Sequence, residues 1–206
     1  MTRLIVQLAG TNGSGKSTPL RELYRMSESK YYINDSTGVA ATWLQDMGIV
    51  VLGNYENDCG GCDTLTGHGG LARITAVLEQ LLNDEILLGI PIVFEGLLVA
   101  SYVNIHRILD MLRKYDTSYL LIHCNPELEV CLSRIYSRNS GKAINEDSVR
   151  GRHSSLRNYI VPKLIGEDVP TIIWNTMCEE DDMVAVFLNL VWDYVGEHGY
   201  KRVTEL

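Results

Sequence analysis

Long apolar runs, internal repeats and closely spaced cysteines are all missing from this sequence. No stretch reaches 18 consecutive apolar residues, so we expect no membrane-spanning helix. The five cysteines are an odd number without the spacing of a secreted disulfide scaffold, so we expect reduced thiols. The N-terminus has the pattern of a core strand and not of a signal peptide. These absences together favour a cytoplasmic protein.

Basic residues are also in short supply. Lys and Arg total 18 against 26 Asp and Glu, which gives a formal net charge of −8. This balance argues against a broad electrostatic surface for nucleic acid, although it leaves room for a local basic groove. With 206 residues, of which 46% are hydrophobic, the chain is long enough for one full core, and we expect residues 1–206 to form a single domain.

The clearest motif lies at residues 4–18, LIVQLAGTNGSGKST. Its glycines let the backbone curl around an anion and present N–H groups to phosphates. Lys16 is then expected to reach the terminal phosphates, and the Ser17 hydroxyl to bind Mg²⁺. The apolar run before the motif predicts a strand, and the helix after it adds its positive end. The motif predicts a nucleotide-binding P-loop made of Gly10, Thr11, Asn12, Gly13, Ser14, Gly15, Lys16, Ser17 and Thr18.

Strand and helix patterns alternate along the rest of the chain. Apolar runs predict strands at 4–9, 31–35, 49–52, 91–96, 118–125 and 171–175. Helices are expected up to Ser27, at 39–47, around 74–82 and 98–112, after Pro126, at 146–164 and around 184–195. The glycine-rich and polar segment 53–70 is expected to be a loop. This alternation predicts an α/β fold with a mostly parallel central sheet and helices on both faces.

Polar residues follow several of the predicted strands. They are Asp35, Glu95, Asn125 and Asn175. Ligands of such folds collect at the carboxyl edge of the sheet, so we expect these residues to converge on the P-loop.

Two further segments, VFEG at 93–96 and CLSRIYSRNSGK at 131–142, resemble those of P-loop kinases that act on nucleosides and nucleotides. The resemblance implies a three-layer P-loop NTPase fold with a small helical lid at about 134–152, and ATP and Mg²⁺ as cofactors. It also implies that Glu95 holds the metal through water or accepts the proton of the acceptor hydroxyl. Arg134 and Arg138, four residues apart on one helix face, would stabilise the transferring phosphoryl group. Asn175 stands where related kinases bind adenine.

The loop at 53–70 is unlike the acceptor sites of adenylate, guanylate or thymidylate kinases. Its GGCD core is similar to phage-encoded kinases that phosphorylate 5-hydroxymethyl-deoxyuridine within DNA. This resemblance implies a flipped base as acceptor and, if the chain is phage-encoded, a place in the host cytoplasm. Within the loop, Gly60, Gly61 and Asp63 are expected to shape an acceptor pocket in which Tyr55 stacks on the acceptor, and Asp35 is a further candidate contact to the acceptor. On the substrate side, Arg150, Arg152 and Arg157 stand where related kinases send arginines back toward phosphate. DNA would meet a basic rim of Arg134, Arg138, Lys142, Arg150, Arg152 and Arg157.

Several alternatives stay open at this level. The acceptor can also be a free deoxynucleoside or nucleoside monophosphate, and a non-catalytic NTP-binding switch is the alternative of another class. Asp35 and Glu95 both qualify as the base, with Glu95 favoured. Cys59 and Cys62 form a single C-x-x-C near His68, which is one ligand short of a structural zinc site, so zinc is not favoured. The oligomeric state is open, a homodimer included.

Overall fold

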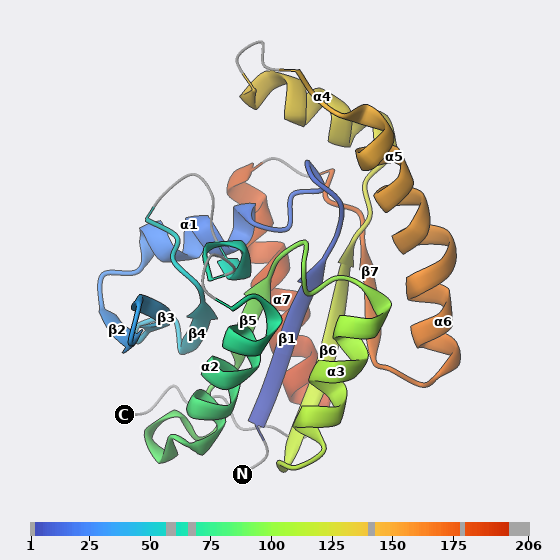
Figure 1. The fold of residues 1–206 in the computed structure, drawn as a ribbon. Coiled ribbons are helices and arrows are strands. Elements are labelled where there is room, and N and C mark those ends of the chain that lie inside the picture. Colours follow the sequence, from blue (N-terminus) through green and yellow to red (C-terminus); the bar gives the residue numbers. More distant parts are fainter. Residues whose placement is uncertain (1–2, 57–60, 66–68, 140–142, 178–179, 198–206) are drawn as a thin grey trace.

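The structure, a computed structural model, describes residues 3–56, 61–65, 69–139, 143–177 and 180–197. Its centre is a seven-stranded sheet with the order β2-β3-β4-β5-β1-β6-β7 (Figure 1). The strands are β1 (Arg3–Ala9), β2 (Lys30–Asp35), β3 (Gly38–Leu44), β4 (Ile49–Leu52), β5 (Ile92–Glu95), β6 (Thr117–Cys124) and β7 (Thr171–Trp174). The five neighbouring strands β4, β5, β1, β6 and β7 run parallel to one another, which confirms the predicted α/β fold with a mostly parallel sheet.

Helices cover both faces of this sheet (Figure 1). One face carries α1 (Thr18–Met26) and α7 (Glu180–Glu197), and the other carries α2 (Leu71–Asn83) and α3 (Tyr102–Leu112). Side chains of β1 alternate between the two faces, because successive residues of a strand point in opposite directions. Leu4, Val6 and Leu8 belong to the core that contains α1 and α7, whereas Ile5 and Ala9 belong to the core under α2 and α3. The result is the three-layer arrangement predicted from the sequence.

Four further helical segments follow one another between β6 and β7. Helix α4 (Leu128–Arg138) is followed by α5 (Glu146–Ser155), a π-helical turn η4 (Leu156–Ile160) and α6 (Val161–Gly166). The helix expected at 146–164 is therefore one helical run with a wide turn in its middle. The segment expected to act as a lid, about 134–152, covers the end of α4 and the first part of α5; residues 140–142 lie outside the described residues.

The prediction of a helix at 39–47 is wrong. These residues form β3 and the turn after it, with β3 antiparallel to both β2 and β4. Ala40 and Ala41 suggest a helix, but Gly38 has a φ of +126° and reverses the chain into a hairpin. Pairing with two neighbouring strands then outweighs the helix preference of alanine. The run at 49–52, whose place in the sheet the sequence left open, becomes the buried strand β4 that joins the hairpin to β5.

Short helical turns complete the chain. The loop at 53–70 contains a 3₁₀ helix, η1 (Gly61–Thr64), and η3 (Glu85–Leu87) follows α2. The helix expected at 98–112 begins only at Tyr102, because the Ser101 hydroxyl accepts a hydrogen bond from the Asn104 N–H and caps it. No helix within the described ranges is long and apolar enough to cross a membrane.

Candidate active site

The P-loop connects β1 to α1, and close packing explains its glycines. Gly13 and Gly15 have φ angles of +76° and +86°, which residues with a Cβ rarely adopt. A Cβ on Gly13 would overlap the carbonyl oxygen of Cys131 on α4, and one on Gly10 would overlap the Ser14 side chain. Lys16 is 7% exposed and lines the cavity beside the loop. The motif therefore has the conformation and the charge that a phosphate group needs.

A cavity of about 950 Å³ lies along the P-loop. One wall comes from the P-loop and α1, a second from α4 and α5, and a third from η1 and the segment after β5. Its charged lining residues are Lys16, Arg21, Asp63, Arg134, Arg138 and Arg152. Five cations thus face one carboxylate, which suits a ligand with several negative charges.

Glu95 ends β5, the strand beside the P-loop strand, as predicted for an acidic residue at this place. It is 1% exposed, and Lys16 Nζ lies 3.9 Å from its Oε2. Burial raises the pKa of the Glu95 carboxyl, while Lys16, the Ser17 hydroxyl and Arg21 act in the opposite direction. Among the described residues no group completes a full hydrogen bond to either carboxylate oxygen. Such a buried acid is available to a ligand.

The 3₁₀ helix η1 sits directly on the end of β5. A Cβ on Gly61 would overlap Glu95 Oε1, so only glycine allows this approach. Asp63 Oδ1 accepts a hydrogen bond of 3.1 Å from the backbone N–H of Leu97. The structure thereby brings Asp63 to the cavity together with Lys16, and Glu95 is buried beside Lys16. The nearby Asp63 charge contributes to the raised pKa of Glu95.

Arg134 and Arg152 connect the helices α4 and α5 to the P-loop. Arg134 donates to the carbonyl oxygen of Thr176 at 2.6 Å and to that of Gly13 at 3.5 Å. Arg152 donates to Asn12 Oδ1 at 3.2 Å. Both arginines, with Arg138, line the cavity, so the structure brings these three predicted residues together.

Arg150 and Arg157 point elsewhere. Arg150 forms ion pairs with Glu146 at 3.1 Å and Glu129 at 3.5 Å, and Arg157 pairs with Glu127 at 3.2 Å. Neither lines the cavity. Two of the arginines expected in the basic rim for DNA thus form ion pairs with acidic side chains on or beside α4 and α5.

Three other predicted site residues do not reach the cavity. The Asp35 carboxylate binds Arg73, with 2.7 Å between Oδ2 and Nε. Tyr55 is 3% exposed and packs beside Tyr24 in the core, so the proposed stacking on an acceptor does not fit its position. Asn175 is exposed and does not line the cavity, whereas its neighbour Thr176 is buried and donates a hydrogen bond to the Ser14 carbonyl oxygen.

Some predicted residues fall on segments that the structure leaves undescribed, and others were missed. Cys59, Gly60, His68 and Lys142 lie outside the described residues. Arg21, one turn beyond Ser17, was missed, although its spacing on the first helix was a usable signal.

A second cavity of about 390 Å³ adjoins the first and shares Leu97, Ser148 and Arg152 with it. It lies between the segment after β5 and the helical run of α5 and η4. Its lining is mainly apolar or small and consists of Leu97, Ala100, Ser101, Ser148, Gly151, Arg152, Ser155, Leu156 and Ile160.

A carboxylate beside the P-loop lysine, next to a cavity lined by arginines from two helices, fits a P-loop kinase, in which such groups position and stabilise the transferring phosphoryl group. The family model described as 5-hmdU DNA kinase matches residues 4–179. The chain belongs to this family.

Individual relatives agree with the family model. The chain is 32% identical over 195 residues to a 5-hmdU DNA kinase of Pseudomonas phage M6, covering 90% of this chain and 98% of the relative. It is 27% identical over 158 residues to that of Pseudomonas phage PaMx11, covering 74% and 78%. Among solved structures, a deoxyadenosine kinase from M. mycoides is similar with a TM-score of 0.48 at 15% identity, covering 92% of this chain and 99% of that one.

Proposed function

We propose that this chain transfers the terminal phosphate of ATP to the hydroxymethyl group of 5-hydroxymethyluracil in DNA. The observation that carries the proposal is the pair of Lys16 and buried Glu95 at the P-loop, in a chain of the 5-hmdU DNA kinase family. In the transfer, the hydroxymethyl oxygen attacks the terminal phosphorus, the bond from that phosphorus to the bridging oxygen breaks, and ADP leaves. Glu95 takes the proton of the attacking hydroxyl, and its raised pKa makes it a better proton acceptor.

The positively charged side chains of the cavity have different roles in phosphate binding and transfer. Lys16 contacts the transferring group, and Arg138 and Arg152 stabilise the negative charge that develops during transfer. Arg134 holds the P-loop and the segment after β7 together through its bonds to Gly13 and Thr176.

The oxygen ligands beside the P-loop fit Mg²⁺. The Ser17 hydroxyl lies near the Glu95 carboxylate, whose oxygens have no full hydrogen bond within the described part of the chain. Mg²⁺ prefers one or two such oxygens together with phosphate oxygens and water. When bound, the ion supplies positive charge to the phosphates of the nucleotide.

We further propose that the smaller cavity receives the acceptor base. The reacting hydroxyl belongs to a substituent of the base, so the base and not the sugar must come next to the terminal phosphate. The cavity offers an apolar lining beside Arg152, which itself contacts the P-loop. A base stacked within a duplex cannot enter such a space, so the target nucleotide must be flipped out.

The test is transfer of labelled phosphate from ATP to a panel of acceptors. The panel holds duplex DNA with 5-hydroxymethyluracil, ordinary duplex DNA, free 5-hydroxymethyl-deoxyuridine and deoxynucleoside monophosphates. We expect label in the modified DNA and no label with the Lys16→Ala variant, which keeps the wild-type melting temperature. Label in a free nucleoside or nucleotide alone would contradict the DNA acceptor, and wild-type activity of Lys16→Ala would contradict the site.

A further inference from the structure

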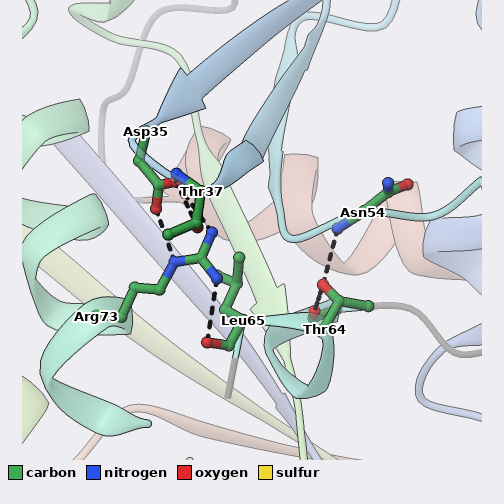
Figure 2. A network of polar contacts seen from close by, with 7 residues as sticks. Asp35, Thr37, Asn54, Thr64, Leu65 and Arg73 are labelled. Carbon is green, nitrogen blue, oxygen red and sulfur yellow. Dashed lines mark hydrogen bonds and ion pairs between the residues drawn. The ribbon is translucent and has the colours of Figure 1, made fainter. Parts of the chain in front are cut away.

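Asp35 and Arg73 form a two-pronged ion pair between the sheet edge and α2 (Figure 2). Arg73 Nε donates to Asp35 Oδ2 at 2.7 Å, and Nη2 donates to Oδ1 at 3.0 Å. The N–H and the hydroxyl of Thr37 each donate to the same carboxylate at 2.7 Å. Both charged side chains are largely covered, with exposed fractions of 11% for Arg73 and 17% for Asp35. The planar guanidinium is therefore fixed in orientation as well as in place.

The remaining arm of this guanidinium holds the end of η1. Arg73 Nη1 donates to the carbonyl oxygen of Leu65 at 3.3 Å. Leu65 follows η1 directly, is 1% exposed, and its N–H donates to the Cys62 carbonyl oxygen at 3.0 Å. On the other side of η1, the Thr64 hydroxyl donates to the Gly61 carbonyl oxygen at 2.7 Å and accepts from the Asn54 N–H at 3.1 Å (Figure 2).

The segment held in this way carries the acceptor side of the active site. Gly61 touches Glu95, and Asp63 lines the main cavity while binding the Leu97 N–H. Leu97 lines both cavities. Arg73 and Asp35 line neither cavity, and the contact of Arg73 with Leu65 connects the pair to η1.

We propose that Arg73, held in place by its ion pair with Asp35, is a positioning residue. It keeps η1 in position beside Glu95 and thereby shapes the site for the acceptor. The proposal rests on the proposed function, because it takes η1 as the acceptor side. It gives Asp35 a role that differs from the base or acceptor contact expected from the sequence. A displacement of about 1 Å in a reacting group costs up to about 10²-fold in rate, so a contact outside the cavity can matter.

The first test compares Arg73→Met and Arg73→Lys with a matched control, Arg113→Met. Arg113 also forms an ion pair with an aspartate, Asp110 at 2.8 Å, but on the exposed surface of α3. We expect Arg73→Met to raise KM for the modified DNA about tenfold and to change KM for ATP less than twofold. Arg73→Lys keeps the positive charge but loses the paired hydrogen bonds of the planar guanidinium, so its effect should lie between wild type and Arg73→Met. The Arg113→Met control should behave as wild type.

A second readout does not depend on the identity of the acceptor. In Arg73→Met the backbone amides of Asn54 and Leu97 should exchange hydrogen faster, because their acceptors Thr64 and Asp63 both belong to η1. Amides of β1 should exchange as in wild type. Unchanged exchange at Asn54 and Leu97, or an equal rise in KM for ATP and DNA, would overturn the positioning role. A wild-type enzyme that leaves modified DNA unlabelled while the exchange result holds would contradict the proposed function alone.

Discussion

Local backbone conformation shapes the phosphate side of this active site, whereas side-chain contacts between residues distant in the sequence hold η1 on the proposed acceptor side. Gly13 and Gly15 shape the P-loop through their φ angles, and the nucleotide-binding residues are consecutive in the chain. On the acceptor side, η1 depends on Arg73 bound to Asp35, 38 residues away, and on Asp63 bound to Leu97, 34 residues away. A kinase can thus keep one phosphate site and acquire a different acceptor by changing a separate set of contacts.

Glu95 stands where the two sides meet, and its removal should have the largest effect. We expect Glu95→Gln to lower kcat by about 10²–10⁴-fold, the usual contribution of a general base. Steady-state kinetics with saturating ATP and modified DNA measure this loss. If Glu95→Gln keeps full activity, another group takes the proton, and Glu95 is not the residue that links the phosphate side to the acceptor side.

The pH dependence of stability and activity gives a second comparison between the wild type and Glu95→Gln. Burial raises the pKa of Glu95 above its unfolded value, so its contribution to stability is full below the unfolded pKa and is lost as the pH rises through the folded pKa. At neutral pH Glu95→Gln should therefore have a larger free energy of unfolding than wild type. In activity, the acidic limb of kcat/KM should lie above the usual glutamate range and be absent from the variant. Equal stability at neutral pH would contradict a raised pKa.

Arg152 and Arg150 offer a contrast within one turn of α5. Arg152 lines the cavity and contacts the P-loop, whereas Arg150 pairs with Glu146 and Glu129 outside it. We expect Arg152→Ala to lower kcat about 10²-fold, because it removes a donor to developing charge. Arg150→Ala should stay within about twofold, as surface ion pairs contribute little. Equal losses in the two variants would mean that both arginines reach phosphate in the closed enzyme.

A larger residue at position 151 tests whether the smaller cavity receives the acceptor base. A Cβ at this position meets no atom within 4 Å, so the helix accepts a larger residue without a clash. Gly151→Leu should obstruct the smaller cavity and lower kcat/KM for modified DNA about tenfold or more, with KM for ATP unchanged. Gly151→Ala is the control and should be more stable by about 0.5–1 kcal/mol with near-normal activity. Full activity of Gly151→Leu would place the base elsewhere.

Tyr55 should give the smallest effect of the series. Its buried hydroxyl has no hydrogen-bond partner among the described residues, and it does not line the main cavity. Tyr55→Phe removes this unsatisfied group, so the free energy of unfolding should rise by about 1 kcal/mol with little change in kcat/KM. Thermal or urea unfolding measures the first quantity. A loss of acceptor binding in this variant would mean that the Tyr55 hydroxyl contacts the acceptor.

The sequence by itself determined the features that depend on neighbouring residues. The glycine spacing and Lys16-Ser17 specify the P-loop, because a few consecutive backbone groups make the whole phosphate cradle. Apolar runs with helical spacing between them specify the parallel sheet, and the end of the strand at Glu95 places a carboxylate beside that loop. Each of these conclusions needed only local pattern and the rule that ligands gather at the carboxyl edge.

Only the tertiary structure decided which charges face the cavity and which neutralise one another. Arg150, Arg152 and Arg157 look alike in the sequence, but only Arg152 lines the main cavity, and the other two form ion pairs with Glu127, Glu129 and Glu146. The partner of Asp35 was likewise set by a residue distant in the chain, since Arg73 lies on α2. Pairing energies between distant residues depend on how the elements pack, and a local pattern carries no record of that packing.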